Sequence, residues 1–260
     1  MNLSGPCGPV GSPAASSQFI EALTFAGLSD GLIASVLAAC APAPQAPAPA
    51  PAQPARGRGR ADLLKLLWWQ GPTVLNPHLA QGTKDYDATR PVYEPLADVD
   101  ADGNFIPVLA AEIPSYENGL LARDGKSVTW KLKQGVRWSD GQPFTAEDVK
   151  FTWEYVTDKD TASTNYDYFS MIADVQIIDQ YTVKLIFEDV TPGWYVPFFG
   201  TAGRVLPKHV FQQYKGKGAG QAPPNNRPVG TGPYKVVDFR PGDVVVYEIS
   251  EYYREPDKPF

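Results

Sequence analysis

Two stretches of the sequence have residue types and spacing that could perform chemistry. The first, residues 27–31, reads Gly-Leu-Ser-Asp-Gly and matches the G-x-S-x-G pattern that exposes a nucleophilic serine, here Ser29, in hydrolases. The strand and helix that should flank such a serine are not indicated here. Only His78 and His209 are available as a general base, and neither has an obvious acidic neighbour. The sequence therefore favours no catalytic residues, with a serine hydrolase as the alternative.

The second stretch is acidic and begins like a calcium-binding loop. Asp98, Asp100 and Asp102 occupy the first, third and fifth positions and Gly103 the sixth, but the twelfth position is Leu109 where a bidentate glutamate is required. We expect a solvated turn between a helix and a strand, with a calcium-responsive surface module as the alternative. With no second histidine or cysteine nearby, the other candidate ligand, His78, indicates a turn or core residue, so we predict no metal site and no cofactor.

Composition excludes several classes of protein. The chain has 260 residues, 43% hydrophobic and 12% aromatic, which is enough apolar material for a real core. The net charge is −6 and no dense basic block is present, so nucleic acid is not an expected partner. The two cysteines, Cys7 and Cys40, are too few for a disulfide framework.

The elements that must position functional residues are short and irregularly ordered. Residues 63–69 are apolar and predict a buried first strand, and residues 127–132 alternate as a half-buried strand does, with Trp130 inward. Thr145 is placed to cap a helix that carries Val149, Trp153 and Val156 on one face. Further hairpins are expected at residues 175–187 and 234–249, and a short helix at residues 207–214. This pattern predicts a mixed α and β fold (α/β class) without repeats.

The N-terminal region resembles the export signal of a bacterial lipoprotein. An apolar run ends in Leu-Ala-Ala-Cys at residues 37–40, which is similar to a lipobox, so the resemblance implies a signal segment at residues 1–39 and lipidation of Cys40. No lysine or arginine precedes Arg56, a departure from the usual basic start of such signals. Residues 40–60 are rich in proline and alanine and predict a semi-rigid linker.

A long stretch of the folded part resembles a known family. Residues 127–154, which include the run Trp-Ser-Asp-Gly-Gln-Pro-Phe-Thr-Ala-Glu-Asp-Val, are similar to the signature of bacterial extracellular solute-binding proteins of the oligopeptide, dipeptide and nickel class. Residues 75–78, 92–96 and 228–234 support the resemblance in the expected order, and we place residues 92–96 in a helix. We expect the 139–141 turn and Trp138 to have scaffold roles.

The resemblance implies a periplasmic-binding-protein-like type II fold. The first lobe would comprise residues 61–93 and 191–260, with a small α+β domain inserted at residues 94–190, and the second lobe would lie outside the sequence. It implies the monomeric binding component of an ATP-driven (ABC) importer, which performs no chemistry and closes on a peptide beside membrane permease subunits. The protein would be tethered in the cell envelope, in the periplasm or on the outer face of the cytoplasmic membrane. Nickel and oligosaccharides are the alternative solutes.

Two patches are the candidates for ligand contact. Position within the family pattern places Gln81, Gly82 and Thr83 on an extended loop that offers backbone groups to the ligand. The second patch is residues 165–168, where Asn165, Tyr166 and Tyr168 could stack on or hydrogen-bond the ligand and Asp167 could pair with an ammonium group. A structural role for these tyrosines is the alternative.

Overall fold

The structure, a computed structural model, describes residues 64–255. The chain divides into two units, Met1–Lys65 and Leu66–Phe260, and the architecture below is that of the second unit. Cys40, Ser29, the predicted signal segment and the predicted linker lie outside the described residues. None of the helices between residues 64 and 255 is long and apolar enough to span a membrane.

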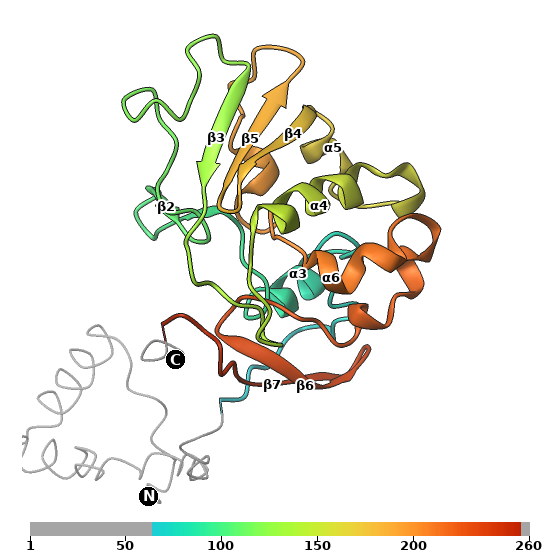
Figure 1. Cartoon of the computed structure of the whole chain (residues 1–260). Helices are drawn as coiled ribbons and strands as arrows, with labels where there is room; N and C mark the ends of the chain where they lie inside the picture. Colours follow the sequence, from blue (N-terminus) through green and yellow to red (C-terminus); the bar gives the residue numbers. More distant parts are fainter. Residues whose placement is uncertain (1–63, 256–260) are drawn as a thin grey trace, which may run out of the picture. The chain divides into compact units, whose positions relative to one another are not determined.

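A three-stranded antiparallel sheet forms one layer of the unit (Figure 1). Its strands are β3 (Ser127–Lys131), β4 (Ile172–Asp179) and β5 (Thr182–Phe187), in the order β3-β5-β4. The alternation expected for β3 is confirmed, because Val128 and Trp130 are buried while their neighbours are more exposed. The predicted hairpin at residues 175–187 is confirmed as the β4–β5 pair.

Helix α4 (Ala146–Thr157) packs against this sheet. Thr145 precedes it as predicted, and the Asp148 carboxylate accepts a hydrogen bond from the Thr145 N–H at 2.9 Å, which satisfies a donor at the helix start. Val149 and Val156 are buried in the hydrophobic core, and Trp153, predicted on the same face, is partly buried against it. Trp138 is also fully buried, and its indole Nε1 donates to Asp148 Oδ2 at 3.4 Å, so its expected scaffold role is confirmed.

Two separate hairpins complete the strands. β6 (Tyr234–Arg240) pairs with β7 (Val244–Ile249), as predicted. β1 (Ala97–Val99) pairs with β2 (Phe105–Pro107), and the acidic stretch forms the turn between them. The expected solvated turn is present, but it joins two strands where a helix and a strand were predicted. The Asp100 carboxylate accepts from the backbone of Asp102 and Asn104 and from the Asn104 side chain, and the hydrogen bonds from Asn104 lower the pKa of Asp100.

The remaining helices are short. They are α3 (Thr83–Thr89), α5 (Tyr166–Phe169) and α6 (Lys208–Phe211), with short 3-10 helices at Lys159–Thr161, Val196–Phe198, Gln212–Tyr214, Gly216–Gln221 and Pro223–Asn225. Pro207 precedes α6, which confirms the predicted start, and the second half of that helix is a 3-10 turn. Side chains from the sheet, α4, α5 and α6 share one hydrophobic core.

Two predicted elements are wrong. Residues 64–69 form no strand, and Leu67 and Trp69 are 98% and 74% exposed. A run of apolar residues indicates burial but cannot supply the neighbouring strand that pairing requires, and no described strand pairs with this segment. Residues 92–96 are not helical, because α3 ends at Thr89 and Pro91 lacks the backbone N–H that a continuing helix would need.

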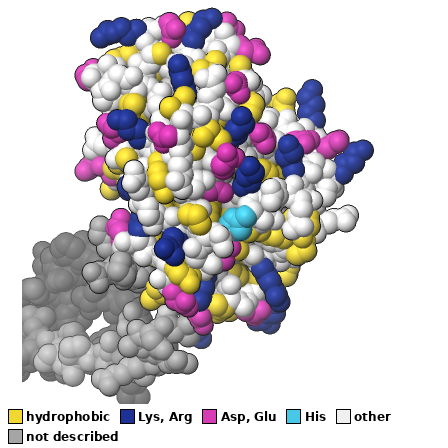
Figure 2. Space-filling model, in the orientation of Figure 1, with side chains coloured by type: hydrophobic (Ala, Val, Ile, Leu, Met, Phe, Trp, Pro, Cys, Tyr) yellow, Lys and Arg dark blue, Asp and Glu magenta, His cyan; other side chains and the backbone are white. Residues whose placement is uncertain are grey.

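The visible surface of the described unit carries charged side chains of both signs, interspersed with small groups of hydrophobic side chains (Figure 2). No dense basic stripe is visible on this face.

Candidate ligand-binding surface

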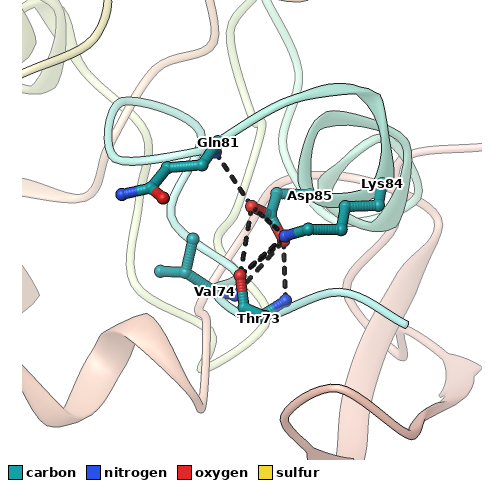
Figure 3. A network of polar contacts seen from close by, with 5 residues as sticks. All are labelled: Thr73, Val74, Gln81, Lys84 and Asp85. Atoms are coloured by element: carbon teal, nitrogen blue, oxygen red, sulfur yellow. Dashed lines mark hydrogen bonds and ion pairs between the residues drawn. The ribbon is translucent and has the colours of Figure 1, made fainter. Parts of the chain in front are cut away.

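A buried carboxylate organises the first candidate patch (Figure 3). Asp85, fully buried on α3, accepts hydrogen bonds from the Thr73 N–H at 2.6 Å, the Gln81 N–H at 2.9 Å and the Lys84 ammonium at 2.8 Å. Burial alone would raise the pKa of Asp85, but the hydrogen bonds from Lys84, Thr73 and Gln81 outweigh it and hold the pKa below its usual value. The network ties the start of α3 to the segment around Thr73.

This network changes the geometry expected for residues 81–83. All three residues are exposed, but they do not form an extended loop. The Gln81 N–H points inward to Asp85, Gly82 precedes the helix with φ 92°, and Thr83 is the first residue of α3. A helix start requires this turn, and the left-handed φ of Gly82 is one that residues with a Cβ rarely adopt. The patch therefore offers side chains and helix-start donors.

The second patch divides into a buried and an exposed part. Asn165 is only 1% exposed, and its Nδ2 donates to Pro77 O at 3.1 Å and lies 3.1 Å from His78 Nδ1. Tyr166 is half-buried, while Asp167 and Tyr168 are exposed on α5, Tyr168 by 47%. Asn165 therefore supports the surface from beneath, and the other three residues face outward.

The structure brings the two patches together through Tyr86, a residue that sequence reasoning missed. Its hydroxyl, on α3, donates to Asn165 Oδ1 at 3.1 Å. The loop at His78 completes the junction, because His78 O accepts from the Thr164 N–H at 2.9 Å and from the Ser163 hydroxyl at 3.0 Å. Tyr86 and Asn165 are 79 positions apart, so no local sequence pattern marks their contact.

His78 has a structural role at this junction. It is fully buried, and its Nε2 lies 2.8 Å from the Arg204 carbonyl, which can only accept, so Nε2 carries the proton and Nδ1 accepts from Asn165. Burial lowers the pKa of His78 to about 4. Both ring nitrogens are occupied, which agrees with the prediction of a turn or core residue. Between residues 64 and 255 no group of three potential metal ligands is found.

Arg204 lies behind the same junction and was also missed. The residue is 3% exposed, and its Nη1 donates to Tyr86 O at 2.7 Å and to Thr89 Oγ1. Burial lowers the pKa of Arg204 to about 10. The Arg204 side chain thus holds the last turn of α3, while the Arg204 backbone carbonyl holds His78.

The expectation that neither histidine has an acidic neighbour is wrong for His209. Its Nε2 lies 2.7 Å from Asp140 Oδ2 on the surface. The two residues are 69 positions apart, which is why the sequence did not reveal the pair. The neighbouring Ser139 hydroxyl accepts from the Gly230 N–H at 3.3 Å, which gives it a structural role.

Among the hollows of the described surface, two differ in their relation to the candidate patches. One of about 240 Å³ lies beside the second patch and is lined by Asp158, Lys159, Ala162, Ser163 and Tyr166. A larger one of about 530 Å³ lies at the end of β3 beside Arg254 and includes none of the candidate ligand residues. The smaller hollow is therefore the one that adjoins the candidate surface.

Comparison with known proteins places the chain in a family. A family model described as "Bacterial extracellular solute-binding proteins, family 5 Middle" matches residues 104–260. The chain belongs to this family. The family resemblance and the type II periplasmic-binding-protein fold expected from residues 127–154 are thereby confirmed.

Individual relatives agree with this assignment. The chain is 30% identical over 183 residues to the glutathione-binding protein GsiB of Pectobacterium atrosepticum, covering 70% of this chain and 33% of the relative. It is 27% identical over 196 residues to the periplasmic oligopeptide-binding protein OppA of Escherichia coli, covering 69% and 34%. The crystal structure of NikZ from Campylobacter jejuni in complex with Ni(L-His) matches with a TM-score of 0.60 and 26% identity, covering 70% and 34%. The chain thus spans about a third of the length of these relatives.

Proposed function

We propose that the chain belongs to the solute-binding component of an ATP-driven (ABC) importer and captures oligopeptides or dipeptides without performing chemistry. The family match over residues 104–260 carries this proposal. Relatives named for glutathione and oligopeptides favour a peptide-like solute. A nickel chelate is the second candidate, favoured by the similarity to NikZ in complex with Ni(L-His).

We propose that the solute lies on one face composed of Gln81, Gly82 and Thr83 together with Tyr166, Asp167 and Tyr168. Two observations support this face: both sets are largely exposed, and the Tyr86–Asn165 hydrogen bond at 3.1 Å joins the segments that carry them. Asp167 is suited to pair with a peptide ammonium, and the tyrosines are suited to stack on side chains. Asn165 would act as the support of this face.

The remaining features of the whole protein follow from the same proposal. Cys40 would carry a lipid anchor after removal of residues 1–39, with residues 40–60 as a tether, on the outer face of the cytoplasmic membrane or in the periplasm. Residues 61–93 and 191–260 would belong to the first lobe and residues 94–190 to the inserted domain. The sheet β3-β5-β4 with α4 falls within the inserted range, which supports this division. The protein would act as a monomer with permease subunits as partners.

Calorimetric titration of the chain with a defined pool of short peptides tests the function. We expect binding weaker than micromolar, because a single face cannot enclose a solute and desolvate it. Submicromolar affinity would contradict the proposal that the solute lies on a single face of this chain. If neither the peptides nor a nickel–histidine chelate binds, the proposal that this chain captures a solute is wrong.

A matched pair of tyrosine variants tests the face. Tyr168 and Tyr116 are 47% and 49% exposed, but Tyr116 lies outside the proposed face. Tyr168→Ala should weaken peptide binding about threefold to tenfold, the usual effect of losing one aromatic contact, and Tyr116→Ala should leave it unchanged. Equal effects of the two variants would exclude the proposed face.

A further inference from the structure

Aromatic side chains gather on the β1–β2 hairpin, and none of them belongs to the proposed solute face. The Phe105 ring, on β2, lies 4.9 Å from the Tyr195 ring and 4.8 Å from the Phe199 ring, and the last two rings are 5.4 Å apart, all between centroids. Val99 is the cross-strand partner of Phe105 and shares its face. Val99 and Phe105 are 44% and 39% exposed, so these four residues, the hairpin cluster, present apolar surface to solvent.

Contacts with the core hold the hairpin cluster in place. The Trp194 ring lies 5.6 Å from the Tyr195 ring and 5.8 Å from the Trp130 ring, between centroids, and Trp130 is only 1% exposed. The rings thus form a continuous series from the hydrophobic core to the surface. Side chains that are already held lose little conformational freedom when a partner binds, so this surface is suited to binding.

Three carboxylates border the hairpin cluster. Asp98 lies on β1 and Asp100 and Asp102 lie in the turn, and none of the ion pairs found between residues 64 and 255 includes them. Hydrogen bonds from Asn104 lower the pKa of Asp100, so its carboxylate stays charged in mild acid. Asp98 reaches the segment just after Phe199, because a Cβ added at Gly200 would lie 3.6 Å from Asp98 Oδ1.

The cations near the hairpin leave its turn negative. Lys133 and Arg254 donate to backbone carbonyls at the far end of the hairpin, away from the turn. The buried Arg204 offsets part of the charge of Asp98. A partner that brings positive charge to the turn end of the hairpin cluster is therefore favoured, because complementary charge selects partners and speeds their association.

We propose that the hairpin cluster is a docking surface for a polypeptide partner that places an aromatic or branched apolar side chain on Phe105, with a lysine or arginine beside it. The apolar side chain packs on Phe105 and Tyr195, since aromatic contacts supply much of the energy of interfaces. The cation pairs with the carboxylates of the acidic turn. This interaction goes beyond solute capture and does not depend on which solute is bound.

Nuclear magnetic resonance of the full chain with the peptide acetyl-Lys-Phe-Lys-Phe-Lys-amide tests this surface. The Val99 methyl resonances should shift saturably, with an affinity at least about threefold higher than for the same peptide with glutamate in place of lysine or alanine in place of phenylalanine. Added sodium chloride should weaken the binding. Equal affinities for the three peptides, or a response at Tyr168 without one at Val99, would overturn the proposal.

Two matched variants test the aromatic anchor. Phe105→Ala should weaken binding of the lysine peptide about threefold to tenfold, whereas Tyr116→Ala, which removes a ring that is 49% exposed outside the hairpin cluster, should leave it unchanged. If Phe105→Ala disorders the hairpin, Asp102→Asn takes its place and should weaken binding about twofold or more. Equal affinities for the variant used and its control contradict the proposal.

Sedimentation of the chain alone tests the alternative occupant. We expect a monomer, in which the hairpin cluster is open to a partner. A dimer that Phe105→Ala dissociates would identify a second copy of the chain as the occupant and would overturn the proposed partner.

Discussion

Mild acid should loosen the candidate surface through His78. In the folded chain the neutral ring donates from Nε2 to Arg204 O and accepts at Nδ1 from Asn165 Nδ2. Protonation puts a second donor on Nδ1, facing the Asn165 amide group. Asn165 cannot simply turn over, because its Nδ2 also donates to Pro77 O and its Oδ1 accepts from Tyr86. Charging His78 therefore breaks the junction between the two patches.

The size of the effect follows from the pKa shift. Burial lowers the pKa of His78 from 6.5 to about 4, so folding favours the neutral ring. The stability that this preference contributes is complete above the unfolded pKa and is lost as the pH falls through 6.5 toward 4. The linkage relation gives a loss of about 2 kcal/mol at pH 5 and about 3 kcal/mol at pH 4.

Urea denaturation at pH 7 and pH 5 measures this loss. The unfolding free energy of the unmodified chain should fall between these two values of pH, and His78→Gln, which cannot titrate, should show a fall smaller by about 2 kcal/mol. His209→Gln is the matched control, because it removes the other histidine, which lies on the surface. If His78→Gln and the unmodified chain lose the same stability, the assignment of the buried neutral ring is wrong.

Three further substitutions, two of them with a matched control variant, test the scaffold by denaturation at pH 7. Asp85→Asn should lower the unfolding free energy by about 3 kcal/mol, because it leaves the Lys84 ammonium buried and without its ion pair. Its control, Glu147→Gln, breaks the exposed pair with Lys208 and should lower the unfolding free energy by at most about 1 kcal/mol. Similar losses for the two variants would contradict the argument from burial. Ala162→Gly should gain about 0.5–1 kcal/mol by relieving a left-handed φ of 52°, and a loss would refute the strain. Gly230→Ala should lower the unfolding free energy by about 2 kcal/mol or more, because the added Cβ would lie 1.9 Å from Val92 O. Its control, Gly218→Ala, adds a Cβ in open space and should change the unfolding free energy by less than about 0.5 kcal/mol.

Local patterns in the sequence predicted the sheet and helix α4 because the information for them is local. The alternation around Trp130 reflects the two-residue period of a strand, and the spacing of Val149 and Val156 reflects the period of about 3.6 residues of a helix. Residues 64–69 show the limit of this reasoning, since apolar character favours burial but does not say against what, and in the structure these side chains are exposed. The helix predicted at residues 92–96 is wrong for a local reason, because Pro91 has no backbone N–H and α3 ends before it, at Thr89.

The candidate surface was only half predictable for a physical reason. Residues 81–83 and 165–168 were identified one segment at a time, whereas their junction depends on Tyr86, His78 and Arg204, which come from three separate parts of the sequence. Hydrogen bonds have strict geometry and couple such segments more specifically than apolar packing does. A surface fixed by a buried polar network loses little freedom when a solute binds, which favours affinity. The same network makes the surface sensitive to one proton on His78, so stability in mild acid and solute binding should decline together.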